Sequence, residues 1–99
     1  MQGFVYILEC SDGSYYTGST VDLERRLNEH FRGEGANHTR KYPPVALVYL
    51  EEFERIDFAY YREKQIQGWS RAKKEALIKM RNDQLHQLAK KPKKIRKQK

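Results

Sequence analysis

The sequence predicts a single α+β domain with the element order β-β-α-β-α-α. Three observations support this prediction. The 99 residues leave room for one hydrophobic core. Three short stretches are rich in β-branched and aromatic residues, and three longer ones combine helical periodicity with capping residues. With 38% hydrophobic and 12% aromatic residues, the chain is too apolar to be disordered throughout. We expect the domain to cover residues 1–87 and a basic, disordered tail to cover residues 88–99.

The first two strands are predicted to form a β-hairpin. Residues 4–10 (FVYILEC) are apolar, aromatic and β-branched, and the Asp-Gly turn signal in SDGS separates them from a second strand that begins with YYT. Residues 45–53 (VALVYLEEF) have the β-branched content of a third strand. The segment before it, GEGANHTRKYPP, is rich in Gly, Pro and polar residues, so we expect a loop there.

The first helix is predicted over about residues 21–31, with Ser19 or Thr20 as its cap and Gly33 just beyond its end. Helical spacing puts Arg26 and His30 on its apolar face. The other members of this face are Leu23, Leu27 and Phe31. Arg26 could lie at the edge of the stripe with His30 hydrogen-bonded in the core. Alternatively, the two side chains, one helical turn apart, could bind one anion such as a phosphate.

The second helix carries a carboxylate on its apolar face. Asp57 can cap this helix, which should end before Gly68. The neighbours of Glu63 on the face are Ala59, Tyr60 and Ile66. Burying an unpaired carboxylate costs several kcal/mol, so Glu63 needs either a cation, for which Arg26 is the candidate, or a metal. Mg²⁺ is often held by one or two carboxylates, with water and phosphate completing its shell. Helix geometry alone leaves both alternatives open.

The remaining features concern the third helix, charge and compartment. Ser70 can cap the third helix, RAKKEALIKMRN. The net charge is +7, but residues 88–99 hold seven basic side chains and no acidic one, so the rest of the chain is balanced at 13 against 13. The cysteine content and the absence of targeting segments indicate the compartment. A single cysteine, Cys10, excludes an intramolecular disulfide. With no long apolar run and no signal-peptide pattern, we expect a cytoplasmic protein.

Read in order, these residues resemble the GIY-YIG nuclease domain over about residues 3–80. The resemblance rests on Phe4-Val5-Tyr6, Tyr16-Thr17-Gly18, Arg26, His30 and Glu63. The segments VYILECSDGSYYTGST, DLERRLNEH, GEGANHTR and WSRAKKEALI resemble the small bacterial members that have no attached DNA-binding domain. The first motif keeps only its tyrosine, and the second has Thr17 in the middle, which changes packing more than chemistry.

The resemblance implies a small antiparallel sheet flanked by helices and a phosphodiesterase that depends on Mg²⁺ or Mn²⁺, with Glu63 as the protein ligand. The stand-alone members further imply that single-stranded or structured DNA is the substrate, in DNA processing or repair. By the same inference, Arg26 stabilises charge on the scissile phosphate, and Tyr6 and His30 orient water or phosphate.

The general base is left open by the resemblance. Tyr16 is the residue implied, and some relatives also use a loop histidine, which here would be His38. An unperturbed tyrosine, with a pKa of about 10, is only about one part in a thousand ionised at pH 7. Whether Tyr16 or a metal hydroxide takes the proton therefore stays undecided at this stage.

A joint site for two tyrosines requires one particular hairpin register. A two-residue Asp12-Gly13 turn would pair Cys10 with Tyr15 and put Tyr6 and Tyr16 on opposite faces of the sheet. A three-residue loop with a glycine bulge, which we expect to pair Cys10 with Tyr16, puts both tyrosines on one face. We predict this longer loop or an equivalent bulge.

Basic residues outside the domain core are predicted to contact DNA phosphates. They are Lys41, Lys90, Lys91, Lys93, Lys94, Arg96 and Lys97. The alternative function is an inactive nucleic-acid-binding module of the same fold, in which Glu63 and Arg26 form a buried ion pair. A third possibility is an interaction protein that uses its aromatic surface. The sequence does not predict the oligomeric state.

Overall fold

The computed structural model describes residues 1–83. The chain divides into two compact units, Met1–Gly68 and Trp69–Lys99. The first unit holds the sheet and the helices that carry the predicted site, and the described part of the second unit is a single helix. The predicted boundary at residue 88 and the basic side chains of residues 88–99 lie outside the described residues.

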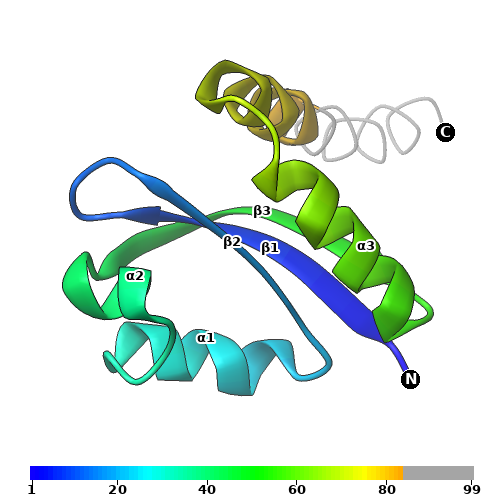
Figure 1. Ribbon diagram of the computed structural model, residues 1–99, viewed down its shortest axis with the longest axis horizontal. Helices are drawn as coiled ribbons and strands as arrows, with labels where there is room; N and C mark the ends of the chain where they lie inside the picture. Colours follow the sequence, from blue (N-terminus) through cyan, green and yellow to red (C-terminus); the bar gives the residue numbers. More distant parts are fainter. Residues whose placement is uncertain (84–99) are drawn as a thin grey trace, which may run out of the picture. The chain divides into compact units, whose positions relative to one another are not determined.

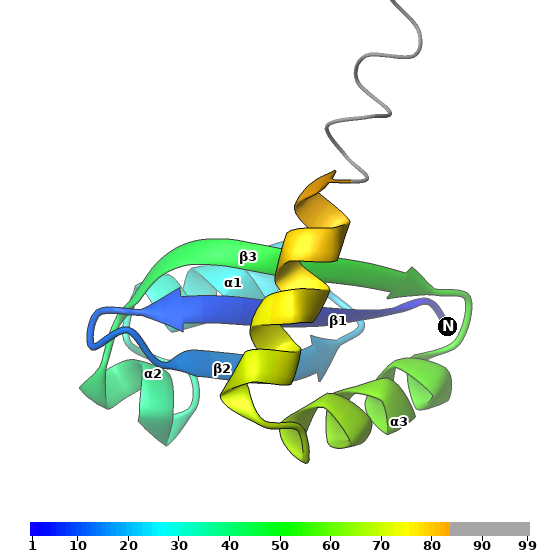
Figure 2. The ribbon, with the colours of Figure 1, turned by 90° about the horizontal axis from the view of Figure 1, so that it is seen from above.

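The first unit is built on a three-stranded antiparallel sheet with strand order β2-β1-β3 (Figure 1). The strands are β1 (Gly3–Cys10), β2 (Tyr15–Thr20) and β3 (Pro44–Phe53). Figure 2 shows β1 between its two neighbours. Val5, Ile7 and Leu8 of β1 are fully buried, which explains why this strand is a nearly continuous apolar run rather than an alternating one. The predicted fold class and element order are confirmed.

The hairpin places the two tyrosines on one face, but with a different pairing from the one predicted. Leu8 pairs with Tyr16, and Tyr6 with Gly18. The predicted pair of Cys10 with Tyr16 is wrong, because the backbone N–H of Cys10 donates to the carbonyl of Ser14, closing a loop of three residues. Gly13 in this loop has φ +85°, the left-handed conformation that a glycine bulge requires. Since the two registers differ by two residues, the side chains keep the predicted face.

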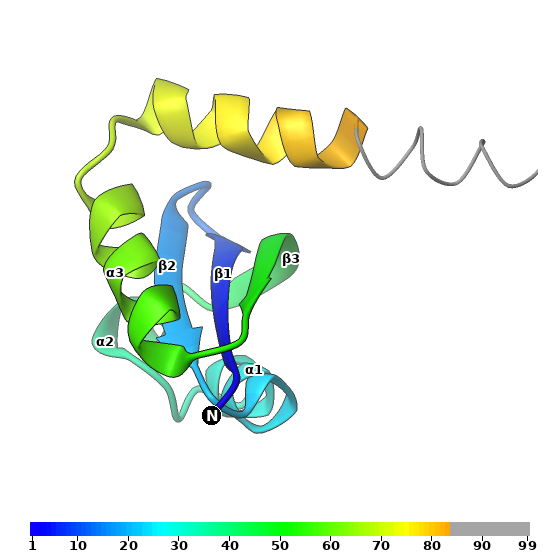
Figure 3. The same ribbon diagram turned by 90° about the vertical axis from the view of Figure 1, so that its right-hand side faces the viewer.

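Helices cover both faces of the sheet (Figures 1 and 3). Helices α1 (Leu23–Phe31) and α2 (Asn37–Lys41) lie on the face that carries Tyr6, and α3 (Ile56–Gln67) lies on the opposite face. The predicted loop GEGANHTRKYPP contains α2, a five-residue helix that the sequence pattern missed. Its N-cap residue, Ala36, makes no side-chain capping bond, so α2 depends on tertiary contacts rather than on a local signal.

The helix caps differ from the predicted ones by a few positions. Asp22 is the N-cap of α1, where its Oδ1 accepts from the Arg25 N–H at 3.1 Å. Thr20 instead accepts from the Asp22 N–H at 3.1 Å, so Ser19 and Thr20 do not cap the helix. In α3 the N-cap position belongs to Arg55, and Asp57, predicted as the cap, lies in the first turn. Several adjacent polar residues can each cap a helix, and the path of the chain out of the strand decides among them.

Two aromatic residues predicted on apolar faces are exposed. Phe31 of α1 is 51% exposed, and Tyr60 of α3 is also 51% exposed. Each follows a fully buried residue, His30 or Ala59, and is therefore rotated by about 100° from the centre of the buried stripe. The buried stripes are thus narrower than the sequence pattern predicts.

A glycine allows close approach of α3 to the sheet. A Cβ built on Gly3 of β1 would lie 2.6 Å from the Cα of Ile56, closer than real Cβ contacts come. Ala59, fully buried, is the next small residue at this contact. The small side chains bring α3 against the strands and so place the face that carries Glu63.

In the second unit, residues 71–83 are helical. The Ser70 Oγ accepts a hydrogen bond from the Lys73 N–H at 3.2 Å, which confirms the predicted cap. The ammonium of Lys73 also lies 4.3 Å from the Trp69 ring centroid, a cation–π contact. None of the helices in the described residues has the length and apolar character needed to cross a membrane.

Candidate active site

A chain of buried hydrogen bonds links β1, α1 and α2. Tyr6 is 1% exposed and His30 is fully buried, and the phenol oxygen of Tyr6 lies 2.8 Å from Nε2 of His30. The other ring nitrogen, Nδ1, lies 2.7 Å from Oγ1 of Thr39, which is also fully buried. The Thr39 hydroxyl in turn donates to the carbonyl oxygen of Ala36 at 3.1 Å.

The donors and acceptors in this chain follow from the last hydrogen bond. A carbonyl oxygen only accepts, so the single hydroxyl proton of Thr39 points to Ala36. Nδ1 of His30 must then carry the proton that it shares with Thr39. In a neutral imidazole Nε2 is therefore an acceptor, and the Tyr6 hydroxyl donates to it.

Burial sets the protonation of both groups. It lowers the pKa of His30 to about 4, because the buried site disfavours imidazolium, and the positive charge of Arg26 adds to this. The pKa of Tyr6 is raised to about 12, first by burial and then by the neighbouring Tyr16. The charge of Glu63 raises it further, and Arg26 acts in the opposite direction. At neutral pH, His30 and Tyr6 are both uncharged.

Two glycines make room for these rings. A Cβ built on Gly18 of β2 would lie 2.6 Å from Cζ of Tyr6, and one built on Gly35 would lie 3.0 Å from Cγ of His30. The phenol therefore lies directly over the backbone of β2, and the imidazole lies against the segment before α2. Any larger residue at Gly18 would displace the Tyr6 ring.

Tyr16 lies beside this chain, as predicted. Its ring centroid is 5.1 Å from that of His30 and 6.5 Å from that of Tyr6. The Tyr16 hydroxyl makes no hydrogen bond within residues 1–83. The two tyrosines thus share one site but differ in state, since the proton of Tyr6 is used by His30 and that of Tyr16 is not.

His38 stacks on Tyr16 from α2. Their ring centroids are 6.0 Å apart, and the ring planes differ by 29°. Nε2 of His38 lies 2.7 Å from Oγ of Ser14, the last residue between β1 and β2. The prediction placed His38 in a loop, whereas it belongs to the short helix α2.

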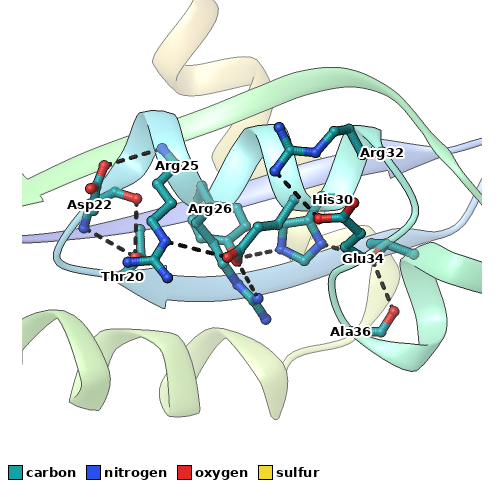
Figure 4. Close-up of polar contacts among 11 residues, drawn as sticks. Thr20, Asp22, Arg25, Arg26, His30, Arg32, Glu34 and Ala36 are labelled. Atoms are coloured by element: carbon teal, nitrogen blue, oxygen red, sulfur yellow. Dashed lines mark hydrogen bonds and ion pairs between the residues drawn. The ribbon is translucent and has the colours of Figure 1, made fainter.

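Arg26 is half-buried on α1 and pairs within its own helix. Its NH1 atom lies 2.9 Å from the Glu29 carboxylate, and Nε of Arg25 lies 3.5 Å from the second oxygen of that group. Figure 4 shows Arg25, Arg26 and His30 along α1 with their polar contacts. A hollow of about 220 Å³ lies here, bordered by Thr20, Val21, Asp22, Arg25, Arg26 and Glu29. Arg26 is not the partner of Glu63.

Glu63 of α3 is half-buried and has only neutral partners. Its carboxylate accepts hydrogen bonds from Ser19 Oγ of β2 and, at 2.6 Å, from Nε2 of Gln67. Gln67 also donates to the carbonyl oxygen of Thr17 at 3.2 Å. Within residues 1–83, Glu63 forms no ion pair. Glu63 thus reaches β2, the edge strand, from the opposite face, and its charge contributes to the raised pKa of Tyr6.

The donor set around Glu63 is consistent with a bound divalent cation. Ser19 and Gln67 orient the carboxylate but do not neutralise it. Residues 1–83 contain no group of three or more His, Cys, Asp or Glu side chains that could hold a metal by themselves. A cation here would have one protein carboxylate and would need other oxygen ligands, a pattern typical of Mg²⁺.

The structure thus brings together most of the predicted residues. Tyr6, Tyr16, His30 and His38 form one cluster, and the electrostatic contributions to the pKa of Tyr6 come from Tyr16, Arg26 and Glu63. Lys41 is exposed on α2, with its ammonium 5.4 Å from the ring centroid of Tyr42, which in turn packs on His38.

The sequence analysis missed the polar residues that hold this cluster in place. They are Asp12, Ser14, Ser19, Glu29, Thr39 and Gln67. The sequence contains a turn signal for Asp12 and Ser14, which we interpreted as turn residues. Helical spacing could have identified Glu29 and Gln67, which lie three and four residues from Arg26 and Glu63. The partners of Ser19 and Thr39 lie 44 and 9 residues away, so no spacing rule identifies them.

Comparisons with known proteins show which family this chain is similar to. Residues 2–76 match the model of the GIY-YIG catalytic domain. A UPF0213 protein of Halobacterium salinarum is 52% identical over 74 residues, which are 75% of this chain and 96% of that protein. A UPF0213 protein of Staphylococcus aureus is 49% identical over 78 residues, 79% of this chain and 95% of that protein.

Two solution NMR structures are also similar. A UPF0213 protein of Bacillus halodurans is 44% identical, with a TM-score of 0.55 over 81% of this chain and 85% of that one. A protein of E. faecalis is 35% identical, with a TM-score of 0.57 over 83% of this chain and 88% of that one.

Proposed function

The chain belongs to the GIY-YIG family, a nuclease superfamily, and from this premise we propose that it is a metal-dependent endonuclease that hydrolyses phosphodiester bonds in DNA. Single-stranded or structured DNA is the proposed substrate, in DNA processing or repair. The observation that supports this function best is Glu63, a half-buried carboxylate without a cationic partner in residues 1–83. Its charge raises the pKa of Tyr6, which lies in a cluster with Tyr16 and His30.

Glu63 is the residue that would hold Mg²⁺ or Mn²⁺. GIY-YIG nucleases generally use divalent metal ions. When bound, such an ion supplies positive charge that offsets the charge developing on phosphate oxygens during the reaction. The neutral hydrogen-bond donors Ser19 and Gln67 keep the carboxylate oriented, which is the usual role of groups behind a metal ligand.

Arg26 binds the scissile phosphate in this proposal. Its guanidinium stays charged at every physiological pH and offers a planar set of N–H donors that matches phosphate oxygens. Glu29 holds the guanidinium at 2.9 Å in the free protein. Because the Arg26–Glu29 ion pair is half-exposed, it contributes little free energy, and a DNA phosphate can replace the Glu29 carboxylate as the partner of Arg26.

Tyr16 and Tyr6 have different roles. The Tyr16 hydroxyl has no hydrogen-bond partner within residues 1–83, so it can orient the attacking water and, as the phenolate formed when it first loses its own proton, accept a proton from that water. The Tyr6 proton is used by His30, so Tyr6 offers only the lone pairs of its oxygen. His30 therefore holds the uncharged Tyr6 in place, and the Tyr6 oxygen is the atom of this pair that orients water or phosphate.

The alternative function, an inactive nucleic-acid-binding module, depended on an ion pair between Glu63 and Arg26. Arg26 pairs with Glu29, so this reason for inactivity is lost. The compartment we propose is the cytoplasm, where a single buried thiol, Cys10, stays reduced.

The test is cleavage of labelled single-stranded, duplex and branched DNA with Mg²⁺, Mn²⁺ or a chelator. The key variant is Glu63→Gln, which keeps the side-chain shape and an oxygen acceptor but removes the charge. We expect its rate to fall by about 100-fold or more. The matched control, Glu54→Ala, removes an exposed carboxylate and should cleave like the wild type.

Two results would contradict the proposed function. One is wild-type protein that binds DNA but cuts none of the three substrates with either metal. The other is equal cleavage by Glu63→Gln and wild type, since the carboxylate charge would then have no part in the reaction.

A further inference from the structure

The segment between β1 and β2 holds two hydrogen bonds of its own and contacts the site through a third. Oγ of Ser14 lies 2.5 Å from Oδ1 of Asp12, and the Ser14 N–H donates to the same oxygen at 3.1 Å. Oγ of Ser14 also lies 2.7 Å from Nε2 of His38. The two Asp12 contacts are ordinary for a tight turn. The third contact is not, because His38 is 24 residues further along the chain.

The direction of these hydrogen bonds fixes the tautomer of His38. The pKa of the Asp12 carboxyl is lowered, chiefly because the Ser14 hydroxyl donates to it, so the group is an ionised carboxylate that only accepts. The one hydroxyl proton of Ser14 is therefore directed to Asp12. Oγ of Ser14 can only accept from His38, and Nε2 of His38 must carry the proton of this contact.

Nδ1 of His38 is then free to interact with substrate. This atom makes no hydrogen bond within residues 1–83, and the neutral ring has its lone pair there. The ring stacks on Tyr16, whose hydroxyl is likewise without a hydrogen-bond partner in that part of the chain. The ring of Tyr42 packs on His38 with a centroid distance of 5.6 Å and limits its rotation.

We propose that Asp12 and Ser14 are positioning residues that hold His38 as its Nε2–H tautomer, so that Nδ1 accepts a hydrogen bond from the water that reacts beside Tyr16. This inference rests on the proposed nuclease function. It gives the Asp-Gly-Ser segment two roles, since the same residues close the hairpin and orient a side chain of α2.

The tautomer can be measured without any catalytic assay. Long-range proton–nitrogen NMR spectra of the ¹⁵N-labelled full-length chain distinguish protonated from unprotonated ring nitrogens. At about pH 8, where an ordinary histidine is neutral, we expect protonated Nε2 in His38 and protonated Nδ1 in His30. In Ser14→Ala, His38 should lose this preference, whereas His30 should be unchanged and so report an intact fold.

Cleavage kinetics test the catalytic part of the inference. We expect Ser14→Ala to lower kcat by about tenfold with little change in KM, because the reacting groups are misaligned rather than unbound. Ser14→Thr keeps the hydroxyl and should restore most of the rate. Ser11→Ala removes an exposed hydroxyl from the same loop and is the matched control. Asp12→Asn keeps the acceptor but not the charge, and its kcat should lie between those of Ser14→Ala and wild type.

The outcomes separate this inference from the proposed function. A His38 ring protonated at Nδ1 in the wild type, or a Ser14→Ala protein with the same tautomer and kcat as Ser11→Ala, would overturn the inference while DNA is still cut. If the wild type cuts no DNA, the proposed function fails, and the catalytic part of the inference fails with it. The NMR spectra then decide the orientation of His38 alone.

Discussion

The two histidines of the site, His30 and His38, are held in opposite ways. His30 is fully buried, and the protein uses both of its ring nitrogens, one for Tyr6 and one for Thr39. His38 is half-buried, and the protein uses only Nε2, through Ser14. The comparison shows how one residue type takes two roles. A ring with both nitrogens paired in the core is part of the scaffold, whereas a ring with one nitrogen unpaired at the surface can bind substrate.

The two networks also differ in where they end. The His30 chain ends on a backbone carbonyl, a neutral acceptor that keeps the imidazole uncharged. The His38 chain ends on the carboxylate of Asp12, a fixed negative charge at the surface. A buried network that ended on an ion would carry the free-energy cost of removing that ion from water, so the neutral carbonyl is the favourable acceptor for the His30 chain. The Asp12 carboxylate stays in contact with water and does not carry this cost.

Removal of each imidazole should give the largest difference between the networks. His30→Ala leaves a cavity and takes the hydrogen-bond partner from the buried Tyr6 hydroxyl, while the Thr39 hydroxyl keeps its bond to the Ala36 carbonyl, so we expect a loss of about 3 to 4 kcal/mol in the free energy of unfolding. His38→Ala should lower the free energy of unfolding by about 1 kcal/mol, the typical contribution of one partly exposed hydrogen bond. Urea denaturation at neutral pH measures both. Equal losses would show that the burial of His30 does not matter energetically.

The pH dependence of stability should come from His30. Its folded pKa of about 4 is below the unfolded value of 6.5, so the unfolded chain binds more protons between these values. The stability contribution is complete above pH 6.5 and is lost as the pH falls towards 4. Between pH 7.5 and pH 4.5 we expect His30 to account for a decrease of about 2.5 kcal/mol.

His30→Gln provides the comparison for this titration. The difference in unfolding free energy between wild type and variant should shrink by the same amount over this pH range. The control Ser11→Ala, which removes no titratable group, should keep the dependence of the wild type. A His30→Gln protein with the full wild-type pH dependence would assign the effect to other groups.

Substitution of Gly18, which lies against the Tyr6 ring, should have a smaller effect on the free energy of unfolding. In Gly18→Ala the new methyl group overlaps the Tyr6 ring and must displace it, so we expect a loss of about 2 kcal/mol. DNA cleavage should fall as well, because Tyr6 would leave its position beside His30. In Gly68→Ala, the added Cβ meets nothing nearer than 3.6 Å, and the change should be within about 0.5 kcal/mol. Thermal and urea unfolding compare the two variants.

The smallest predicted effect is a gain in stability. Oγ1 of Thr17 is buried and makes no hydrogen bond within the described residues, unlike the hydroxyl of Thr39. Thr17→Val should therefore raise the free energy of unfolding by about 1 kcal/mol, since it removes an unsatisfied polar atom at nearly equal volume. Thr39→Val should have the opposite sign. A loss in both variants would mean that Thr17 has a partner, such as an ordered water.

Local patterns predicted the elements well and the connections poorly. The three strands and the longer helices follow from apolar runs, periodicity and turn residues, which act over a few neighbours. The helix α2 was missed because its capping residue makes no side-chain hydrogen bond and its Thr39 is fixed by His30. The side chain of Glu63 was interpreted as a charge that needs either Arg26 or a metal as its partner, and the first of these alternatives is wrong, since Arg26 pairs with a nearer carboxylate, Glu29.

The sequence by itself determined the residue types of the site and the helix faces that carry Arg26, His30 and Glu63, because helical periodicity is a local property of the chain. Only the tertiary structure decided which of these groups meet and in which protonation state. The Tyr6–His30 contact joins residues 24 apart, and the Ser19–Glu63 contact joins residues 44 apart. The depressed pKa of His30 arises from burial, which comes from the packing of α1 and α2 on the sheet and from no single segment.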